Sequence, residues 1–352
     1  MTNCVVAGNT ATTYGQRGFG IYSVGANLQL VDCLFSNNYG AGVATRTAFG
    51  VGLCFDNGTL RALRTDFIEN KGGANNGGGG AAVYLGNNAA TSATFSNCVF
   101  RSNAALFNGP TSPGYGGAMW LNMAAAATAR VVNCTFYDNV NSNGNGGAIY
   151  LGGGTLVLKN SILWNNAVGS GYTGTEIYQA GGVLDASYCD LTGLSAPQVV
   201  GATLPASCQA NDPLFASATD LHLQSKSGRW DPVANMFVTT DAGYSPCIDA
   251  GEPADPIGAE PTDNGNVRIN MGRYGGTAQA GKTPPPVLPR PADHGCVVNY
   301  DHANISGELT NDTYVSAWIY LCYGLASIPG NTTNGWDVVM NIGEKQNGVV
   351  FS

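Results

Sequence analysis

The 352-residue chain is poor in charged residues, and above all in positive ones. Charged residues make up 11% of it, and 15 Lys and Arg stand against 23 Asp and Glu, a formal net charge of −8. Ordinary globular chains are about 25% charged. Because nucleic-acid binding needs a surplus of Lys and Arg to neutralise phosphates, the composition excludes nucleic acid as the main partner.

Long hydrophobic runs, a leader peptide and clustered metal ligands are also missing. No stretch has 18 consecutive apolar residues, so no transmembrane helix is predicted. The three His residues are scattered and there is no Cys-x-x-Cys, which argues against zinc. Met1 to Cys4 contain neither a basic region nor an apolar core. Because Cys4 already lies in the repeat register described below, we expect a signal peptide and an N-terminal cap to be missing from this sequence.

Glycine and hydrophobic residues are abundant instead. The chain has 50 Gly, and 44% of its residues are hydrophobic. Disorder goes with low hydrophobicity and high net charge, so a disordered chain is excluded. A Gly-rich chain with little charge and many hydrophobic residues is typical of β-solenoids.

An internal repeat predicts the architecture. Seven segments share a Cys, Thr or Ser, a Phe, Leu or Val two residues later, and in six of them an Asn five residues later. The first position is occupied by Cys4, Cys33, Thr65, Cys98, Cys134, Ser161 and Cys189, at spacings of 29, 32, 33, 36, 27 and 28 residues. A nearly constant period of this length is the mark of a solenoid.

Within each repeat the residues alternate with period two, as in β-strands. A second strand in each repeat has a central aliphatic residue that we expect to point inward: Ile21, Leu53, Val83, Met119, Ile149 and Ile177. No stretch has a sustained helical period. We therefore predict an all-β fold: a right-handed parallel β-helix of about seven coils, with a C-terminal cap and a small strand-rich tail.

Two polar columns run through the repeats, and we interpret both as structural. The Asn column is expected to form a hydrogen-bonded ladder between coils, with a ligand site as the alternative. Cys4, Cys33, Cys98, Cys134 and Cys189 share an inward position with Thr65 and Ser161, which suggests buried thiols; a Cys98–Cys134 bridge is the alternative. Cys208–Cys247 and Cys296–Cys322 are the expected disulfides.

Two sets of motifs resemble known families. The pairs Phe100-x-x-Asn103 with Gly116-Gly117-Ala118-Met119, and Phe136-x-x-Asn139 with Gly146-Gly147-Ala148-Ile149, resemble polymorphic outer-membrane-protein repeats. Gly80-Ala81-Ala82-Val83 departs from that pattern by lacking the second Gly. The resemblance covers roughly residues 1–195. It implies a secreted or surface-exposed bacterial solenoid, often adhesive, and implies no catalytic residue.

The resemblance also bears on the domain organisation. Residues 1–207 are predicted to form the solenoid, and residues 208–282 to cap its open hydrophobic end. The motifs Asp212-Pro213-Leu214-Phe215 and Ser245-Pro246-Cys247-Ile248-Asp249 make this second segment similar to the choice-of-anchor-type tail of secreted bacterial β-helix proteins. Residues 283–291 read as a stiff Pro-rich linker, and residues 292–352 as an unassigned strand-rich tail that is short for a complete domain.

Outward aromatic residues on consecutive coils are the candidate binding residues. One column comprises Tyr84, Trp120, Tyr150 and Tyr178; a second comprises Arg101, Tyr137 and Trp164. The rise of a β-linked glycan is about 5 Å per sugar, close to the strand spacing of about 4.8 Å, so one sugar could stack on each coil. The structural alternative is a buried aromatic ladder that contributes only stability.

No motif specifies a reaction. Glycoside hydrolysis needs two carboxylates about 5–9.5 Å apart, and Asp32 and Asp66 on adjacent coils come closest to such a pair. For a polysaccharide lyase, Arg64 is the first basic residue to test. No cofactor is predicted except, at most, Ca²⁺ at Asp249 to Asp255 or Asp263 to Asn266, where ordinary turns are the alternative.

Three functions remain open from the sequence. The preferred one is a secreted or cell-surface bacterial protein, monomeric, that binds a polysaccharide or cell-surface glycan through its lateral face. The second is an enzyme, a polysaccharide lyase or glycoside hydrolase, acting in a groove along the solenoid. The third is a structural spacer or adhesin. Buried aromatic rings would favour the spacer, and exposed rings without a carboxylate pair would favour the binder.

Overall fold

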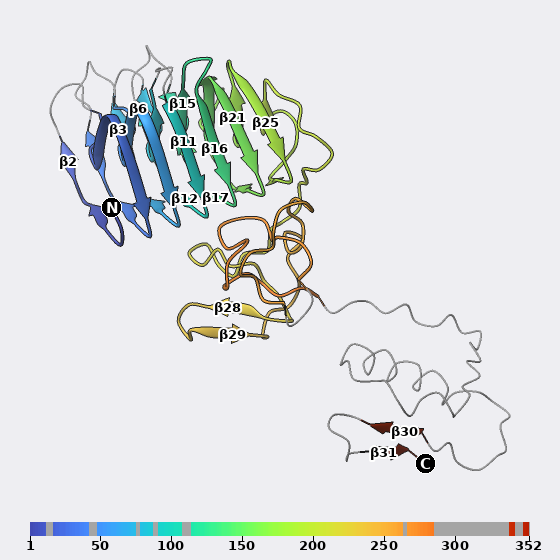
Figure 1. Ribbon diagram of the computed structural model, residues 1–352. Coiled ribbons are helices and arrows are strands. Elements are labelled where there is room, and N and C mark those ends of the chain that lie inside the picture. The colour runs from blue at the N-terminus through green and yellow to red at the C-terminus, as the bar shows by residue number, and fades with distance from the viewer. Residues whose placement is uncertain are drawn as a thin grey trace. The chain divides into compact units, whose positions relative to one another are not determined.

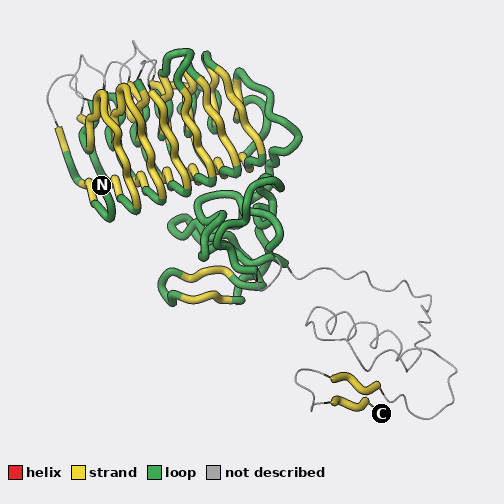
Figure 2. Tube along the Cα trace, in the orientation of Figure 1, coloured by secondary structure: helices red, strands yellow, loops and turns green. Residues whose placement is uncertain are grey.

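A computed structural model describes residues 1–11, 17–41, 48–74, 78–86, 91–107, 114–262 and 266–284, together with the strands at 338–341 and 348–351. The chain divides into two compact units, Met1–Pro285 and Pro286–Ser352. The described part of the first unit contains strands and turns and no helix, and its coils form a parallel β-helix (Figures 1 and 2). The predicted fold class is therefore confirmed.

One parallel sheet takes a three-residue or two-residue strand from each of the seven repeats. Among the described residues its strands, in spatial order, are β1 (Val5–Ala7), β4 (Leu34–Ser36), β7 (Asp66–Ile68), β12 (Val99–Arg101), β17 (Thr135–Tyr137), β22 (Ile162–Trp164) and β26 (Asp190–Leu191). The register aligns the repeats as the sequence predicted: Phe67 pairs with Phe100, and Phe100 with Phe136.

A larger parallel sheet covers two further sides of the solenoid. Its two longest strands, β3 (Ile21–Val31) and β6 (Leu53–Leu63), run along both sides. In later coils the strand is divided. One series continues as β10 (Val83–Leu85), β15 (Met119–Asn122), β20 (Ile149–Gly153), β24 (Ile177–Gln179) and β27 (Val199–Val200), and the other as β11 (Thr91–Ser96), β16 (Thr128–Val132), β21 (Thr155–Lys159) and β25 (Val183–Ser187).

Short strands complete the coils. In the part of the chain that is described, they are β2 (Thr10–Ala11), β5 (Tyr39–Ala41), β8 (Lys71–Ala74), β13 (Ala104–Phe107), β18 (Val140–Asn141) and β23 (Ala167–Val168) in one sheet, and β9 (Gly78–Gly79), β14 (Gly114–Tyr115) and β19 (Gly144–Asn145) in another. Two antiparallel hairpins lie outside the coils, β28 (Arg229–Asp231) with β29 (Met236–Val238), and β30 (Val338–Asn341) with β31 (Gly348–Phe351).

Left-handed residues make the bends on both sides of each three-residue strand. The residue before the Cys position has a positive φ in every repeat: Asn3, Asp32, Arg64, Asn97, Asn133, Asn160 and Tyr188, between 46° and 53°. Asn and Asp tolerate this conformation better than other non-Gly residues, which accounts for their recurrence there. The second bend places Asn37, Glu69, Ser102, Asp138 and Asn165 at φ between 53° and 58°.

The Cys position holds a small side chain that is buried in six of the seven repeats, as predicted, and that also donates a hydrogen bond. The Sγ of Cys98 donates to the carbonyl of Ser96 at 3.4 Å, and the Oγ of Ser161 donates to Lys159 at 2.8 Å. Thr65 does the same toward Leu63 at 3.2 Å. Any residue with a short donor side chain meets this requirement, which explains why Cys, Thr and Ser alternate.

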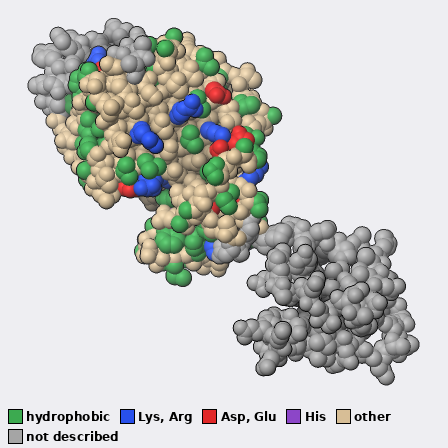
Figure 3. Space-filling view, viewed as in Figure 1, with side chains coloured by type: hydrophobic (Ala, Val, Ile, Leu, Met, Phe, Trp, Pro, Cys, Tyr) green, Lys and Arg blue, Asp and Glu red, His purple; other side chains and the backbone are tan. Residues whose placement is uncertain are grey.

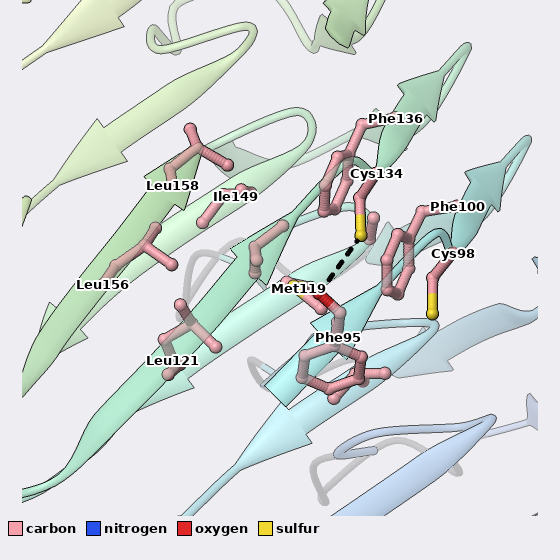
Figure 4. Packing of buried hydrophobic residues seen from close by; sticks show 14 of the residues in the cluster. Phe95, Cys98, Phe100, Met119, Leu121, Cys134, Phe136, Ile149, Leu156 and Leu158 are labelled. Carbon is pink, nitrogen blue, oxygen red and sulfur yellow. Dashed lines mark hydrogen bonds between the residues drawn. The ribbon is translucent and has the colours of Figure 1, made fainter. Parts of the chain in front are cut away.

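Stacked aromatic rings fill the centre of the solenoid (Figure 4). The rings of Phe35, Phe67, Phe100 and Phe136 lie on consecutive coils with centroid separations of 4.9, 5.0 and 4.4 Å and nearly parallel planes. Figure 4 shows the last two of these rings, Phe100 and Phe136. All four are fully buried, and the inward column from Leu53 to Ile177 is buried with them. Cys134 lies among these rings, and its Sγ also reaches the carbonyl of Phe95.

The Asn ladder is confirmed as a hydrogen-bonded chain that runs in one direction. Each side-chain Nδ2 donates to the Oδ1 of the next coil, through Asn9, Asn38, Asn70, Asn103, Asn139 and Asn166, at 2.7 to 3.0 Å. The same Nδ2 of Asn70 also donates to the carbonyl of Phe35. The ladder therefore satisfies buried amides and ties three successive coils together at each step.

Residues 209–284, the lateral segment, lie along the outer side of the seven-stranded sheet. The Nδ2 of Asn97 donates to the carbonyls of Arg273 and Gly275, and Asn133 Nδ2 donates to that of Asn270. Ala202, Leu204 and Cys208, just before this segment, pack on the core at the last coil. The sequence assigned residues 208–282 to the open end of the solenoid. Gln209 bridges to Asp190 in the last coil, whereas Asn270, Arg273 and Gly275 contact the side of the sheet.

The disulfide predicted between Cys208 and Cys247 is wrong, since both are free thiols. Cys247 instead donates its Sγ–H to Asp190 Oδ2 at 2.9 Å, and Cys208 lies against Cys189. The physical reason is that Cys208 belongs to the solenoid core, whereas Cys247 belongs to the small hydrophobic cluster between the sheet and the lateral segment. The other predicted pair, Cys296 and Cys322, lies outside the described residues.

Candidate functional site

The first aromatic column lies in exact register on the outer side of the larger sheet. Tyr84 pairs with Trp120, Trp120 with Tyr150, and Tyr150 with Tyr178, on strands β10, β15, β20 and β24. These strands alternate, so the neighbours of each ring, such as Met119 and Leu121, point into the core. The four residues are thus brought together as the sequence predicted.

Two further rings join this column, and the sequence analysis missed both. Phe49 lies 5.2 Å from the ring centroids of both Tyr84 and Trp120. Tyr115, on β14, lies 4.5 Å from Trp120 and 4.8 Å from Tyr150. They come from the neighbouring sheet at the corner of the coil, where period two does not extend. We call these six residues the aromatic row.

The members of the aromatic row differ in exposure. Tyr84 is buried, with 5% of its surface exposed, so its ring is not accessible to a ligand. Trp120, Tyr115, Tyr150 and Tyr178 are partly exposed. The rings of Tyr150 and Tyr178 are stacked, with centroids 5.4 Å apart and planes 21° apart. The row is therefore a packed ladder at one end and an accessible pair of stacked rings at the other.

A charged group borders the buried end of the aromatic row. Arg17 forms an ion pair with Asp56 at 2.8 Å, and its guanidinium lies 5.3 Å from the ring of Phe49. The hydroxyl of Tyr22, which is 50% exposed, donates to the same carboxylate at 3.2 Å. Cys54, between Tyr22 and Tyr84 in the register, is fully buried, and burial raises the pKa of its thiol well above the usual range.

The second aromatic column is also in register, and the lateral segment packs on two of its three residues. Arg101 pairs with Tyr137 and Tyr137 with Trp164 on β12, β17 and β22. The ring of Phe215 in the lateral segment meets Tyr137 edge to face at 5.6 Å, and Trp164 packs on the cluster formed with the same segment. These rings hold the lateral segment against the sheet.

The candidate catalytic residues are separated into two ion pairs. Asp32 accepts two hydrogen bonds from Arg64, at 2.6 and 2.8 Å, and Arg64 holds the pKa of that carboxyl below its usual value. Asp66 lies 3.2 Å from the guanidinium of Arg273 in the lateral segment. Burial raises the pKa of Asp66 even though this cation opposes the shift. Each carboxylate has its own Arg partner.

Among the residues that the structure describes, three other carboxyl groups are buried, and none had been singled out. Burial raises the pKa of Glu176 and of Glu260 to about 7, and that of Asp190 to about 6. Glu176 occupies the position where other coils have Ala82, Ala118 and Ala148. A carboxylate in a column of alanines is the signal that could have identified it.

The described residues contain no group of three or more His, Cys, Asp or Glu that could hold a metal ion. Of the stretches considered for Ca²⁺, the carboxylate of Asp249 accepts from the backbone of Val267 and Arg268, and Asp255 pairs with Lys159. Positions 263–265 lie outside the described part of the chain. The carboxylates of Asp249 and Asp255 are thus paired with donors from the protein itself.

Comparisons with protein-family models, with curated proteins and with solved structures find no match for this chain. Within the described ranges, no helix is long and apolar enough to cross a membrane.

Proposed function

We propose that this protein is a polysaccharide-binding module whose contact surface is the exposed end of the aromatic row. The observation that carries the proposal is the stacked pair Tyr150 and Tyr178, joined without a gap to Tyr115 and Trp120. Flat, partly exposed rings at intervals of about 5 Å provide the apolar surface on which sugar rings stack.

The register supports an extended ligand parallel to the solenoid axis. Trp120, Tyr150 and Tyr178 lie on three consecutive parallel strands, which are spaced about 4.8 Å apart. An extended β-linked glycan advances by roughly the same distance per sugar. Three consecutive sugars can therefore each meet one ring.

The ion pairs of the candidate catalytic residues favour binding over catalysis. A glycosidase needs one carboxyl as acid and a second as nucleophile or base within about 5–9.5 Å. Asp32 is held by both nitrogens of Arg64, and Asp66 faces Arg273 under the lateral segment. The aromatic row has Asp56 at its buried end, and that carboxylate is paired with Arg17.

We further propose that the protein acts at a bacterial cell surface or outside the cell, where polysaccharides are found. This inference is supported by the repeat motifs that resemble polymorphic outer-membrane proteins and by the choice-of-anchor-like sequence of residues 208–282. Fractionation of the producing cells tests this location, and recovery of the protein only from the cytoplasm would contradict it.

Affinity gel electrophoresis with a panel of neutral and acidic polysaccharides tests the binding. Tyr178→Ala should weaken retardation at least about tenfold, equivalent to about 1.4 kcal/mol. Tyr39→Ala is the matched control, because Tyr39 is 42% exposed on a different sheet. Retardation that survives Tyr150→Ala and Tyr178→Ala would overturn the assignment. Release of reducing ends would show instead that the protein is a glycoside hydrolase, and release of an unsaturated product would show that it is a polysaccharide lyase.

A further inference from the structure

Two arginines without partners lie on the broad outer face formed by β3, β6, β11, β16, β21 and β25. Arg61 on β6 and Arg130 on β16 are exposed, and their strand neighbours Leu60 and Ala129 are buried in the core. Neither guanidinium has a hydrogen bond or an ion pair with any residue that the structure describes. We call this surface the arginine face.

The register places the two arginines in one column, two coils apart. Thr94 on β11 pairs with Arg61 on one side and with Arg130 on the other. Since parallel strands are spaced about 4.8 Å apart, the two guanidiniums leave the sheet about 10 Å from each other. The two cations are therefore separated by one coil, which carries Thr94 in the same column.

A column of hydroxyl groups runs beside the arginines. Thr59, Ser92, Thr128 and Thr155 are aligned on four consecutive strands and point outward; Thr59 and Ser92 are exposed, and Thr128 and Thr155 are partly exposed. Short hydroxyl side chains leave the face flat and can donate or accept hydrogen bonds. A polymer lying along the axis would meet hydroxyls on one side and guanidiniums on the other.

The arginine face is basic although the chain as a whole is acidic. In the part of these strands that carries Arg61 and Arg130, the outward residues of β11 and β16 include no carboxylate. Asp56 lies nearer the start of β6, where it is paired with Arg17, and Asp185 on β25 is in the arginine column two coils beyond Arg130. The net charge of the chain is −8. Figure 3 shows this face turned toward the viewer, with Lys and Arg side chains spread over it and a few Asp and Glu side chains among them. Such a local excess of positive charge favours an anionic ligand.

We propose that the arginine face binds an acidic polysaccharide that carries one carboxylate or sulfate on every second sugar. Two β-linked sugars span about 10 Å, the distance between the two guanidiniums, so each anionic group meets one arginine. Guanidinium pairs with carboxylate or sulfate through two parallel hydrogen bonds. The site is separate from the aromatic row and does not depend on it.

Nucleic acid fits this face poorly. Phosphates follow one another about every 3.4 Å along a strand of duplex DNA, and binding strength depends on neutralising many of them. Two guanidiniums about 10 Å apart, in a chain of net negative charge, would neutralise too few. The spacing of the charges therefore favours a polymer with sparse anionic groups.

Titration calorimetry of the full chain with hyaluronan oligosaccharides, which have one carboxylate on every second sugar, tests the proposal. At low salt the double variant Arg61→Gln/Arg130→Gln should bind at least about tenfold more weakly, and each single variant about threefold more weakly. Lys226→Gln is the matched control, because it removes one exposed cation from the lateral segment. Binding that is lost in Trp120→Ala and kept in the double arginine variant would assign hyaluronan to the aromatic row and overturn the proposal.

A gain-of-function variant tests the spacing itself. Thr94→Arg places cations on three consecutive coils, so it should shift the preference toward alginate, which has a carboxylate on every sugar. Unchanged hyaluronan binding in the double variant, or no binding by the wild-type protein at low salt, would overturn the proposal. Equal binding of hyaluronan and alginate by the wild-type protein would overturn the spacing argument, and stronger binding of single-stranded DNA would overturn the choice of ligand.

Discussion

Asn166 donates its side-chain amide to the carboxylate of Glu176 at 2.6 Å, so the buried ladder that starts at Asn9 ends on an ionisable group. Glu176 is fully buried in the last full coil, and burial raises the pKa of its carboxyl to about 7. The ladder thus couples the stability of the solenoid to pH.

Glu176→Gln should remove part of the pH dependence of stability. The unfolded carboxyl ionises near 4.5 and the folded one near 7, so ionisation favours the unfolded state across this window. The free energy of unfolding of the wild type should fall by up to about 3 kcal/mol as the pH rises from 4.5 to 7. This fall in the free energy of unfolding should be absent in the Glu176→Gln variant. Urea unfolding at pH 5 and pH 8 measures the difference, with Glu69→Gln as the control.

Asn103→Ala should destabilise the solenoid by about 3 kcal/mol. The Oδ1 of Asn103 accepts from the backbone and side chain of Asn70, and its Nδ2 donates to Phe67 and Asn139. All of these groups are buried. Asn9→Ala, at the partly buried first rung, should cost much less. Equal losses for the two variants, measured by urea unfolding, would contradict a role for the continuous ladder.

Cys98→Ser should change the free energy of unfolding by less than about 1 kcal/mol. The serine hydroxyl can make the same hydrogen bond to the carbonyl of Ser96, as Ser161 does to Lys159. Cys98→Leu should cost about 2 kcal/mol or more, because the residue is fully buried and the extra volume has no space. Thermal unfolding under reducing conditions compares the two.

Glu69→Asn should stabilise the protein by about 0.5–1 kcal/mol. Glu69 has a φ of 56°, a conformation that costs other residues more than it costs Asn. Asn37 is at the equivalent bend, with a φ of 53°, and replacing it in Asn37→Ala should destabilise the protein by a similar amount. Opposite signs are expected in chemical denaturation, and the same sign for both would rule out the backbone explanation.

Arg273→Ala should loosen the lateral segment. Arg273 pairs with Asp66, donates to the carbonyl of Asn97 and lies 5.7 Å from the ring of Tyr274. Removing these contacts should cost about 2 kcal/mol and speed proteolysis between residues 209 and 284. Lys226→Ala, on the exposed surface, should have no effect. Mass spectrometry of the early fragments identifies where cleavage occurs.

Features that repeat along the chain could be predicted from the sequence. Period two within a strand and a period near 30 residues are enough to align Tyr84 with Trp120, or Asn70 with Asn103. The left-handed bends also recur at fixed positions. Each of these relationships is between neighbouring coils, so a local pattern specifies it.

Features that bring distant or irregular segments together could not be predicted. Phe49 and Tyr115 reach the aromatic row from corners of the coil where no alternation applies. Asp66 meets Arg273 across more than half of the chain, and nothing in either local sequence indicates the partner. The same difficulty led to the incorrect pairing of Cys208 with Cys247, which lie in separate hydrophobic clusters.

The one-directional Asn ladder has a consequence for how such a chain can change in length. Every internal rung makes the same bonds to the coil before it and the coil after it. If one whole coil were deleted or duplicated in the gene, Asn70 could meet Asn139 as well as it meets Asn103. Recombination between repeats would therefore yield solenoids of different reach that keep the same internal bonding.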